Sequence, residues 1–544
     1  MNEITKWFSH PLYRWMDEEK YESMDKVLKR NCTEEYIKKI LNHYDNISFK
    51  ELHFYPAGTY SEPEKTVLDN IDAFYEIRME QKVSKNHVAQ FRVYLPVKWN
   101  HRFMGISGAG TNTEVDWFSS ARFNVISWPM ALNNGYACAV TDTDTGIRLD
   151  CSWGFDKTGE IEWEHIDAWA FHSMHEMTVC AKEILEAVYN MPPIASYMHG
   201  TSGGGREVVT EAILYPNDYD GLWADAPSID LVNLSFTCVW AAVVEANEKH
   251  IVPLSKYIAA RDISMRDPVL REHPFNRQHI CWMDFLNHLC GLETEDGPIT
   301  RKDIAVMVKT WEGPVLPDGR RIAYGFGPII RQWPLPNGNP LYGYFQRRED
   351  GKYNLMPIAE QYIRWFVKNP NFDIHTCSYE KFAQIYDSCH ARFDRYSFNE
   401  CDYTPYARSG GKLIITQGTG DCVVPYQQMI DYYRNAFDYF PSEKIMNDTI
   451  RLFMPPLAGH SILDWSGPAV SIADGMTALT NWVEKGIAPE CLPTQRYDFA
   501  RDCAVEKSSV QVYDQWQYTA RQQQKYITGL YSIRGLQNEI VISN

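Results

Sequence analysis

The chain has 544 residues, 44% of them hydrophobic and 23% charged, which is the balance of a globular protein with a large buried core. Its net charge of −17 disfavours nucleic acid as a partner, because no cluster of lysine and arginine offsets it. No apolar run reaches the roughly 18 residues of a membrane span, so we expect no membrane partner.

The cysteines and the N-terminus bear on the compartment. The 13 cysteines lie between Cys32 and Cys503 without a C-x-x-C pair or a zinc-like spacing. We therefore expect free, mostly buried thiols in a reducing compartment. Residues 1–30 lack a basic stretch followed by an apolar one, so no signal peptide is predicted and we expect a cytoplasmic protein. The oligomeric state stays open.

The pattern of predicted helices and strands changes near residue 85. Residues 1–84 are predicted to be a polar, partly helical N-terminal region packed on the core, with a helix over Glu34–Tyr44. Beyond it, strands and helices alternate, as in β-α-β units with a mainly parallel sheet. Strands are predicted at Val88–Tyr94, Arg102–Ile106, Tyr136–Val140, Ala195–Met198 and Gly221–Ala224, and helices at Ala168–Tyr189 and Glu207–Leu214.

The alternation stops between residues 228 and 405 and then returns. Lys412–Thr416 and Ile450–Met454 read as buried strands, and Gly475–Trp482 reads as a helix. The sequence thus predicts an α/β fold whose core comprises residues 85–227 and 406–544, the latter with a C-terminal extension. The inserted domain, 228–405, is expected to lie over the carboxyl ends of the strands as a lid above a substrate pocket.

A glycine-rich turn follows the predicted strand at Ala195. Residues 200–204 read Gly-Thr-Ser-Gly-Gly, the G-x-S-x-G nucleophile elbow. Strand and helix nearly touch at such a turn, so the flanking residues are small and the serine hydroxyl is presented to substrate. The turn also directs the next N–H, that of Gly203, toward a developing oxyanion. The alternative interpretation is a glycine-rich turn whose serine has no catalytic role. Which interpretation applies depends on whether an acid and a histidine accompany Ser202.

Two later loops supply those partners. In α/β-hydrolases the nucleophile is followed by an acid and then by a histidine. Asp421 closes a small-residue loop after the strand at 412–416, and His460 lies on a Pro/Gly loop after the strand at 450–454. A serine needs a neutral imidazole to accept its proton, and the imidazole needs a carboxylate to fix its tautomer. We therefore predict a Ser202–Asp421–His460 triad in an α/β-hydrolase fold.

The oxyanion hole needs a second N–H donor, usually from a loop after an early strand. Residues 107–110 read Ser-Gly-Ala-Gly directly after the predicted strand at Arg102–Ile106. Gly108 and Ala109 are the candidates for this donor, alongside Gly203.

Several segments between residues 85 and 490 resemble the tannase and feruloyl esterase family. They are Lys98–Phe103, Phe171–Lys182, Gly200–Arg206, Tyr215–Gly221, Ala226–Pro227, Trp311–Gly319, Gly459–His460 and Trp482–Gly486. The resemblance implies an α/β-hydrolase core with a large inserted lid, and it assigns the triad to Ser202, Asp421 and His460. It also implies hydrolysis of esters of aromatic acids such as gallate or hydroxycinnamates; relatives also cleave a terephthalate monoester.

The chain departs from the family pattern at several positions. The family usually joins a cysteine before the serine to one after the histidine; here Thr201 and Ser461 stand there, and a hydrogen bond between them is a possible substitute. The family lid usually carries a calcium loop, but residues 255–300 show no aspartate- and glycine-rich equivalent, so we expect no cofactor. Asp225 and Gln417 stand where the family suggests glycine and histidine.

We therefore expect a carboxylic ester hydrolase acting on a small-molecule ester through an acyl-enzyme on Ser202. An acyltransferase or a peptidase with the same triad is the alternative enzyme, and a catalytically silent binding protein on the same fold is the alternative class. His172 and His175 have a spacing that a metal site could use, but no third ligand accompanies them, so we predict no metal site.

Overall fold

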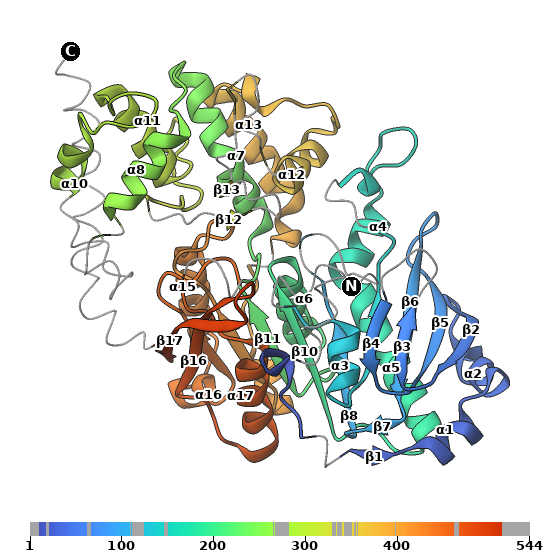
Figure 1. Cartoon of the computed structure of the whole chain (residues 1–544). Helices are drawn as coiled ribbons and strands as arrows, with labels where there is room; N and C mark the ends of the chain where they lie inside the picture. Colours follow the sequence, from blue (N-terminus) through green and yellow to red (C-terminus); the bar gives the residue numbers. More distant parts are fainter. Residues whose placement is uncertain are drawn as a thin grey trace.

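The computed structural model describes residues 10–17, 21–61, 67–108, 110, 125–145, 151–264, 266, 282–328, 333–334, 340–341, 351–352, 355, 357–397, 399–461 and 467–513. A nine-stranded sheet forms the centre of the protein, with the strand order β15-β14-β11-β10-β8-β9-β6-β5-β2 (Figure 1). Its strands are β2 (Ile47–Tyr55), β5 (Phe74–Lys82), β6 (Val88–Pro96), β8 (Arg102–Ile106), β9 (Ala137–Thr141), β10 (Ala195–Thr201), β11 (Gly221–Asp225), β14 (Lys412–Thr416) and β15 (Ile450–Phe453).

The sheet is mainly parallel, as the sequence predicts. Strands β9, β8, β10, β11, β14 and β15 pair in parallel, whereas β6, β5 and β2 extend the sheet by antiparallel pairing. The parallel strands are buried except for the first residue of β8 and of β14, which is why they read as short continuous apolar runs. The α/β-hydrolase fold class is thereby confirmed.

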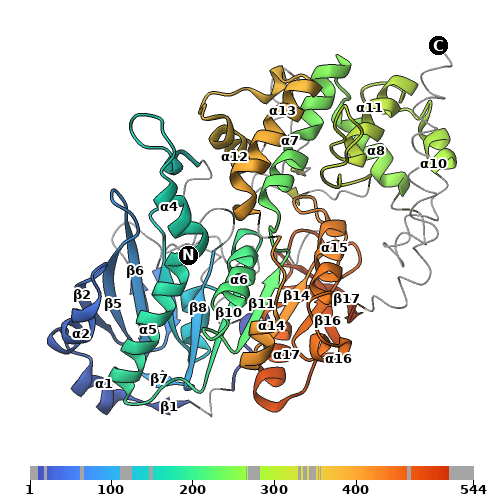
Figure 2. The same cartoon turned by 180° about the vertical axis from the view of Figure 1, so that it is seen from behind.

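Helices cover both faces of the sheet (Figure 2). One face packs against α5 (Ser173–Tyr189), α6 (Gly203–Leu214) and α15 (Tyr426–Phe437). The other packs against α3 (Trp128–Asn133) and α17 (Ile472–Lys485). The remaining short helices of the core are α1 (Asp25–Asn31), α2 (Glu34–Ile40), α4 (Trp163–Asp167), α14 (Thr404–Ser409) and α16 (Glu443–Asn447).

The N-terminal region contributes more to the core than we expected. Strands β2 and β5 belong to the central sheet, although both fall within the 1–84 region that the sequence analysis placed outside it. Strand β2 lies at the edge of the sheet, and every side chain except that of Ile47 is exposed or half-exposed, so buried and exposed positions do not alternate clearly along it. Its hydrophobic period is therefore hard to recognise before its partner strand is known.

The described part of the segment between β11 and β14 is mainly helical, and its helices gather beyond one end of the sheet (Figures 1 and 2). They are α7 (Leu231–Glu248), α8 (Leu254–Ser264), α10 (Trp282–Leu289), α11 (Arg301–Glu312), α12 (Pro357–Val367) and α13 (Tyr379–Phe393). Their apolar side chains form a hydrophobic cluster of their own, which also takes in Trp153 and Trp169 of the core. Because α7 starts just after β11, the segment begins at the carboxyl edge of the sheet.

In the described part of the chain, four two-stranded pairs accompany the central sheet. They are β1 (Glu22–Ser23) with β7 (Lys98–Trp99), β3 (Gly58–Ser61) with β4 (Val67–Ile71), β12 (Trp333–Pro334) with β13 (Pro340–Leu341), and β16 (Cys491–Asp498) with β17 (Cys503–Gln511). Over the described ranges, no helix is both long and apolar enough to cross a membrane. The cysteines that the structure describes are free thiols, and most of them are buried, as expected.

Candidate active site

The predicted nucleophile lies on a strained turn between β10 and α6. Ser202 has φ 59° and ψ −116°, a region that residues with a side chain rarely adopt. Its N–H donates to the carbonyl oxygen of Asp225 on the neighbouring strand at 2.9 Å. The backbone of the sheet therefore holds the serine in the conformation that a nucleophile elbow requires.

The glycines around Ser202 are imposed by close packing. A Cβ added to Gly203 would lie 1.7 Å from the carbonyl oxygen of Gly110, and one added to Gly204 would lie 1.9 Å from that of Gly108. A Cβ at Gly200 would meet the backbone of Gly204 at 2.3 Å. The predicted oxyanion loop thus packs directly on the elbow, and any side chain at these positions would push the two apart.

The predicted oxyanion donors are placed unequally. Gly203 is the first residue of α6, where backbone N–H groups have no partner within the helix. The Gly108 N–H instead donates to the Glu207 carboxylate at 3.4 Å, a long contact. Ala109 lies outside the described residues. The assignment of the second donor to Gly108 or Ala109 therefore stays a prediction.

The acid and the histidine lie together on the loops after β14 and β15. His460 Nδ1 donates to Asp421 Oδ2 at 2.7 Å, and both side chains are buried. The N–H groups of Val423 and Val424 donate to the other carboxylate oxygen at 2.7 and 3.0 Å. Gln417 Nε2 also donates to Asp421 Oδ2, at 2.9 Å. The carboxylate is therefore fixed from several sides and in turn fixes the imidazole tautomer.

The electrostatics of His460 suit a general base that becomes a cation. Burial lowers the pKa of His460, but the negative charges of Asp421 and Asp225 and the hydrogen bond to Asp421 raise it, with a net rise above 6.5. A raised pKa means that the imidazolium formed during proton transfer is stabilised relative to solution.

Ser202 and His460 lie at the same edge of the sheet, but their side chains are not hydrogen-bonded to each other. Thr201, Asp225, Thr416 and Phe453 are successive cross-strand partners at the carboxyl ends of β10, β11, β14 and β15. Among the described residues, Ser202 Oγ hydrogen-bonds with Ser228 Oγ at 3.2 Å and not with the imidazole. Catalytic hydrogen bonds commonly form only when substrate is bound.

A third carboxyl group, which the sequence analysis noted only as a departure, is part of this edge. Asp225 is buried, and its carboxylate accepts a hydrogen bond from Thr416 Oγ1, which in turn accepts one from Trp223 Nε1. Burial raises the pKa of Asp225 from 3.8 to about 7; the bond from Thr416 and the charge of His460 oppose the rise. Asp225 therefore titrates near neutrality beside the Asp421–His460 pair.

The suggested Thr201–Ser461 hydrogen bond is not formed. Thr201 Oγ1 and Ser461 Oγ are both buried, and neither has a hydrogen-bond partner within the described structure. The loops are connected elsewhere: Leu457 N–H donates to Thr419 Oγ1 at 2.8 Å, and Gly420 N–H donates to the Ala458 carbonyl at 2.9 Å. Hydrogen bonds between the acid loop and the histidine loop thus take the place of a covalent link.

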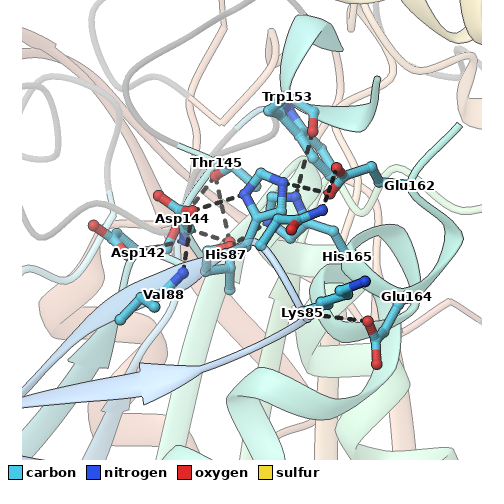
Figure 3. A network of polar contacts seen from close by, with 12 residues as sticks. Lys85, His87, Val88, Asp142, Asp144, Thr145, Trp153, Glu162, Glu164 and His165 are labelled. Carbon is cyan, nitrogen blue, oxygen red and sulfur yellow. Dashed lines mark hydrogen bonds and ion pairs between the residues drawn. The ribbon is translucent and has the colours of Figure 1, made fainter. Parts of the chain in front are cut away.

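Two histidine clusters lie away from the predicted triad. His175 bonds to Asp218 at 2.6 Å and stacks on Tyr215 rather than pairing with His172. His87 lies between Asp144 and Glu162, with its two nitrogens 2.7 and 2.6 Å from their carboxylate oxygens (Figure 3).

The His87 ring also stacks on the His165 ring, with 3.7 Å between the ring centroids and 21° between the ring planes. The ligand atoms of His87, Asp144 and His165 lie within 4.8 Å of one another, but each ring nitrogen of His87 already faces a carboxylate oxygen. His165 Nε2 moreover faces the Thr143 carbonyl at 2.8 Å. We therefore interpret this network as a clamp that joins three segments of the chain.

The comparisons with known proteins agree with this geometry. The Tannase and feruloyl esterase family matches residues 76–527, so the chain belongs to this family. A probable feruloyl esterase of Arthroderma benhamiae is 27% identical over 74% of both chains. A mono(2-hydroxyethyl) terephthalate hydrolase of Piscinibacter sakaiensis is 21% identical, again over 74% of both chains.

Solved structures share the fold. Tannin acyl hydrolase from Aspergillus niger superposes with a TM-score of 0.72 at 17% identity, covering 89% of this chain and 92% of that chain. Feruloyl esterase B from Aspergillus oryzae gives 0.71 at 18% identity, covering 88% and 96%. The protein is a carboxylic ester hydrolase of this family.

Proposed function

We propose that the protein is a serine esterase that hydrolyses esters of aromatic acids, with Ser202, Asp421 and His460 as its triad. The observation that carries the proposal is the Asp421–His460 hydrogen bond at the carboxyl edge of the sheet where the strained Ser202 lies. A serine, a tautomer-fixed imidazole and a buried carboxylate are the groups that acyl transfer requires.

In the proposed reaction, His460 takes the Ser202 proton while Ser202 Oγ bonds to the ester carbonyl carbon. The Gly203 N–H and a second amide of the 107–110 loop stabilise the oxyanion. Collapse breaks the bond to the alcohol oxygen, which receives the proton from His460, and leaves an acyl-enzyme. Water then attacks the acyl-enzyme with His460 as its base, and the proton returns to Ser202 as the acid leaves.

The substrate class rests on family membership. The relatives and neighbours named above are a feruloyl esterase, a tannin acyl hydrolase and a terephthalate monoester hydrolase, and each of these names implies an aromatic acyl group. We infer that this chain also takes an aromatic acyl group.

We further infer that the inserted helical segment acts as a lid. Trp365 of α12 packs edge-on against Trp153 of the core at 4.9 Å between ring centroids. Trp153 also packs against Trp169, and the Arg206 guanidinium lies 4.1 Å from the Trp169 ring centroid. Since Arg206 is on the first turns of α6, directly after the elbow, this aromatic contact links the segment to the active site.

The test is ester hydrolysis by the wild type, Ser202→Ala and Ser235→Ala. Substrates are methyl gallate, methyl ferulate, a terephthalate monoester and a short aliphatic nitrophenyl ester. We expect at least one aromatic ester to have a higher kcat/KM than the aliphatic one, and a loss of about 10³-fold or more in Ser202→Ala. Ser235 is buried in α7, and its hydroxyl donates to the Leu231 carbonyl of the same helix at 2.8 Å, so its replacement should leave turnover unchanged. Turnover that survives in Ser202→Ala would contradict the proposal.

A further inference from the structure

Ser228 is a second hydroxyl at the nucleophile. It lies between β11 and α7 and is buried, with 6% of its surface exposed. Its Oγ lies 3.2 Å from Ser202 Oγ, and its N–H donates to the Ser202 carbonyl oxygen at 2.9 Å. The two serines are therefore joined through both backbone and side chain.

The backbone around Ser228 is held tightly. Ala226 has φ 43°, and its N–H donates to the Thr416 carbonyl at 2.7 Å. A Cβ added to Gly205 of α6 would lie 2.8 Å from Pro227 Cα, so this turn packs on the helix that follows the nucleophile. The backbone positions of Ser202 and Ser228 are thus fixed by the sheet and by α6.

The chemistry of the triad decides which hydroxyl donates. Ser202 has one hydroxyl proton, and in the proposed mechanism this proton goes to His460. Ser202 Oγ can therefore only accept in its contact with Ser228 during the reaction. Ser228 Oγ has no other hydrogen-bond partner within the described residues, so its proton is free to point at Ser202 Oγ.

We propose that Ser228 is a catalytic residue whose hydroxyl donates a hydrogen bond to Ser202 Oγ while that oxygen carries negative charge. This proposal rests on the proposed esterase function and adds a group to its mechanism. During attack, the Ser202 O–H bond breaks toward His460 as the Oγ–carbon bond forms; during deacylation, the carbon–Oγ bond breaks as Oγ regains a proton. Ser228 keeps its own proton in both steps and stabilises the charge on Oγ.

The direction in which the reaction rate changes when the Ser228 hydroxyl is removed distinguishes a catalytic role from an inhibitory one. Hydrogen bonds to charged groups are stronger than those between neutral groups. Removing the donor should therefore destabilise the transition states of acylation and deacylation more than the resting state. Both barriers should then rise. If Ser228 instead only drew Ser202 away from His460, its removal would speed the reaction.

The experiment compares Ser228→Ala, Ser228→Thr and the wild type, with Ser235→Ala as the matched buried-serine control. Two rates are measured: kcat/KM on the best ester of the panel, and the second-order rate of labelling by a fluorophosphonate. We expect about a tenfold loss of both rates in Ser228→Ala, with KM and melting temperature little changed. Ser228→Thr, which keeps the hydroxyl, should retain most of the wild-type rate, and Ser235→Ala all of it.

Rates in Ser228→Ala equal to or above the wild type would overturn the proposal. So would equal losses in Ser228→Ala and Ser228→Thr, because the rate would then follow the space at this position and not the hydroxyl. A wild type that neither turns over esters nor reacts with the fluorophosphonate would instead defeat the proposed function itself. That failure is recognised before any variant is compared.

Discussion

Asp225 is expected to destabilise the folded protein near neutral pH, and Asp225→Asn should remove this cost. Burial raises the pKa of this carboxyl from 3.8 to about 7. One unit of pKa difference corresponds to about 1.4 kcal/mol, so the rise in the pKa of Asp225 from 3.8 to about 7 corresponds to about 4 kcal/mol. An asparagine has nearly the same shape, stays neutral, and can still accept the hydrogen bond from Thr416.

The gain should depend on pH in a defined direction. Between pH 3.8 and about 7 the folded state holds a proton on Asp225 that the unfolded state has lost, so the free energy of unfolding falls as pH rises through this window. Below this pH window Asp225 costs the folded state little free energy, and above the window the full cost applies. Asp225→Asn should therefore gain about 3 kcal/mol more at about pH 8 than at about pH 5.

Urea unfolding of Asp225→Asn and the wild type at both pH values measures this difference. Asp262→Asn is the matched control, because the Asp262 side chain is 49% exposed whereas Asp225 is buried. A stabilisation of Asp225→Asn that is the same at both pH values would refute the reasoning, as would a loss of stability that is larger at the higher pH.

Three further predictions concern the reaction. Asp421→Asn should keep the fold but lower kcat by about 10⁴-fold, because the amide does not fix the required tautomer of His460; single-turnover kinetics measure this. Since the pKa of His460 is raised and the base must be neutral, kcat/KM should fall as pH drops through a value above 6.5, and in Asp225→Asn this acid limb should move to lower pH; an unmoved limb would show that Asp225 does not act on His460. Gly203→Ala places a Cβ 1.7 Å from Gly110 O, so we expect loss of activity and a free energy of unfolding lower by about 1–3 kcal/mol; a fully active variant would contradict the close packing.

The central part of the fold could be predicted from the sequence because its strands are short and fully buried. The strands at 102–106 and 412–416 were predicted with the bounds that β8 and β14 have, and those at 88–94 and 195–198 are shorter than β6 and β10 by two to three residues. Buried parallel strands read as continuous apolar runs, and the loops after them hold the predicted chemistry. The structure places Asp421 and His460 in direct contact, as predicted.

Other features depend on contacts that a sequence does not display. Strand β2 is an edge strand whose pairing with β5 becomes evident only in the folded sheet. Ser228 and Asp225 carry no motif of their own; they enter the site because β11 lies between β10 and β14. Asp225 was visible as a departure from the family pattern, but its neutral-range pKa follows from burial, which no local pattern encodes.

The most direct test of the account is to look for the acyl-enzyme. The wild type is mixed with its best aromatic ester, quenched in acid within the first turnovers, digested, and examined by mass spectrometry beside Ser202→Ala. We predict the acyl group on the peptide that contains Ser202, and no such adduct in the variant. An adduct on another residue, or sustained turnover in Ser202→Ala, would contradict Ser202 as the nucleophile.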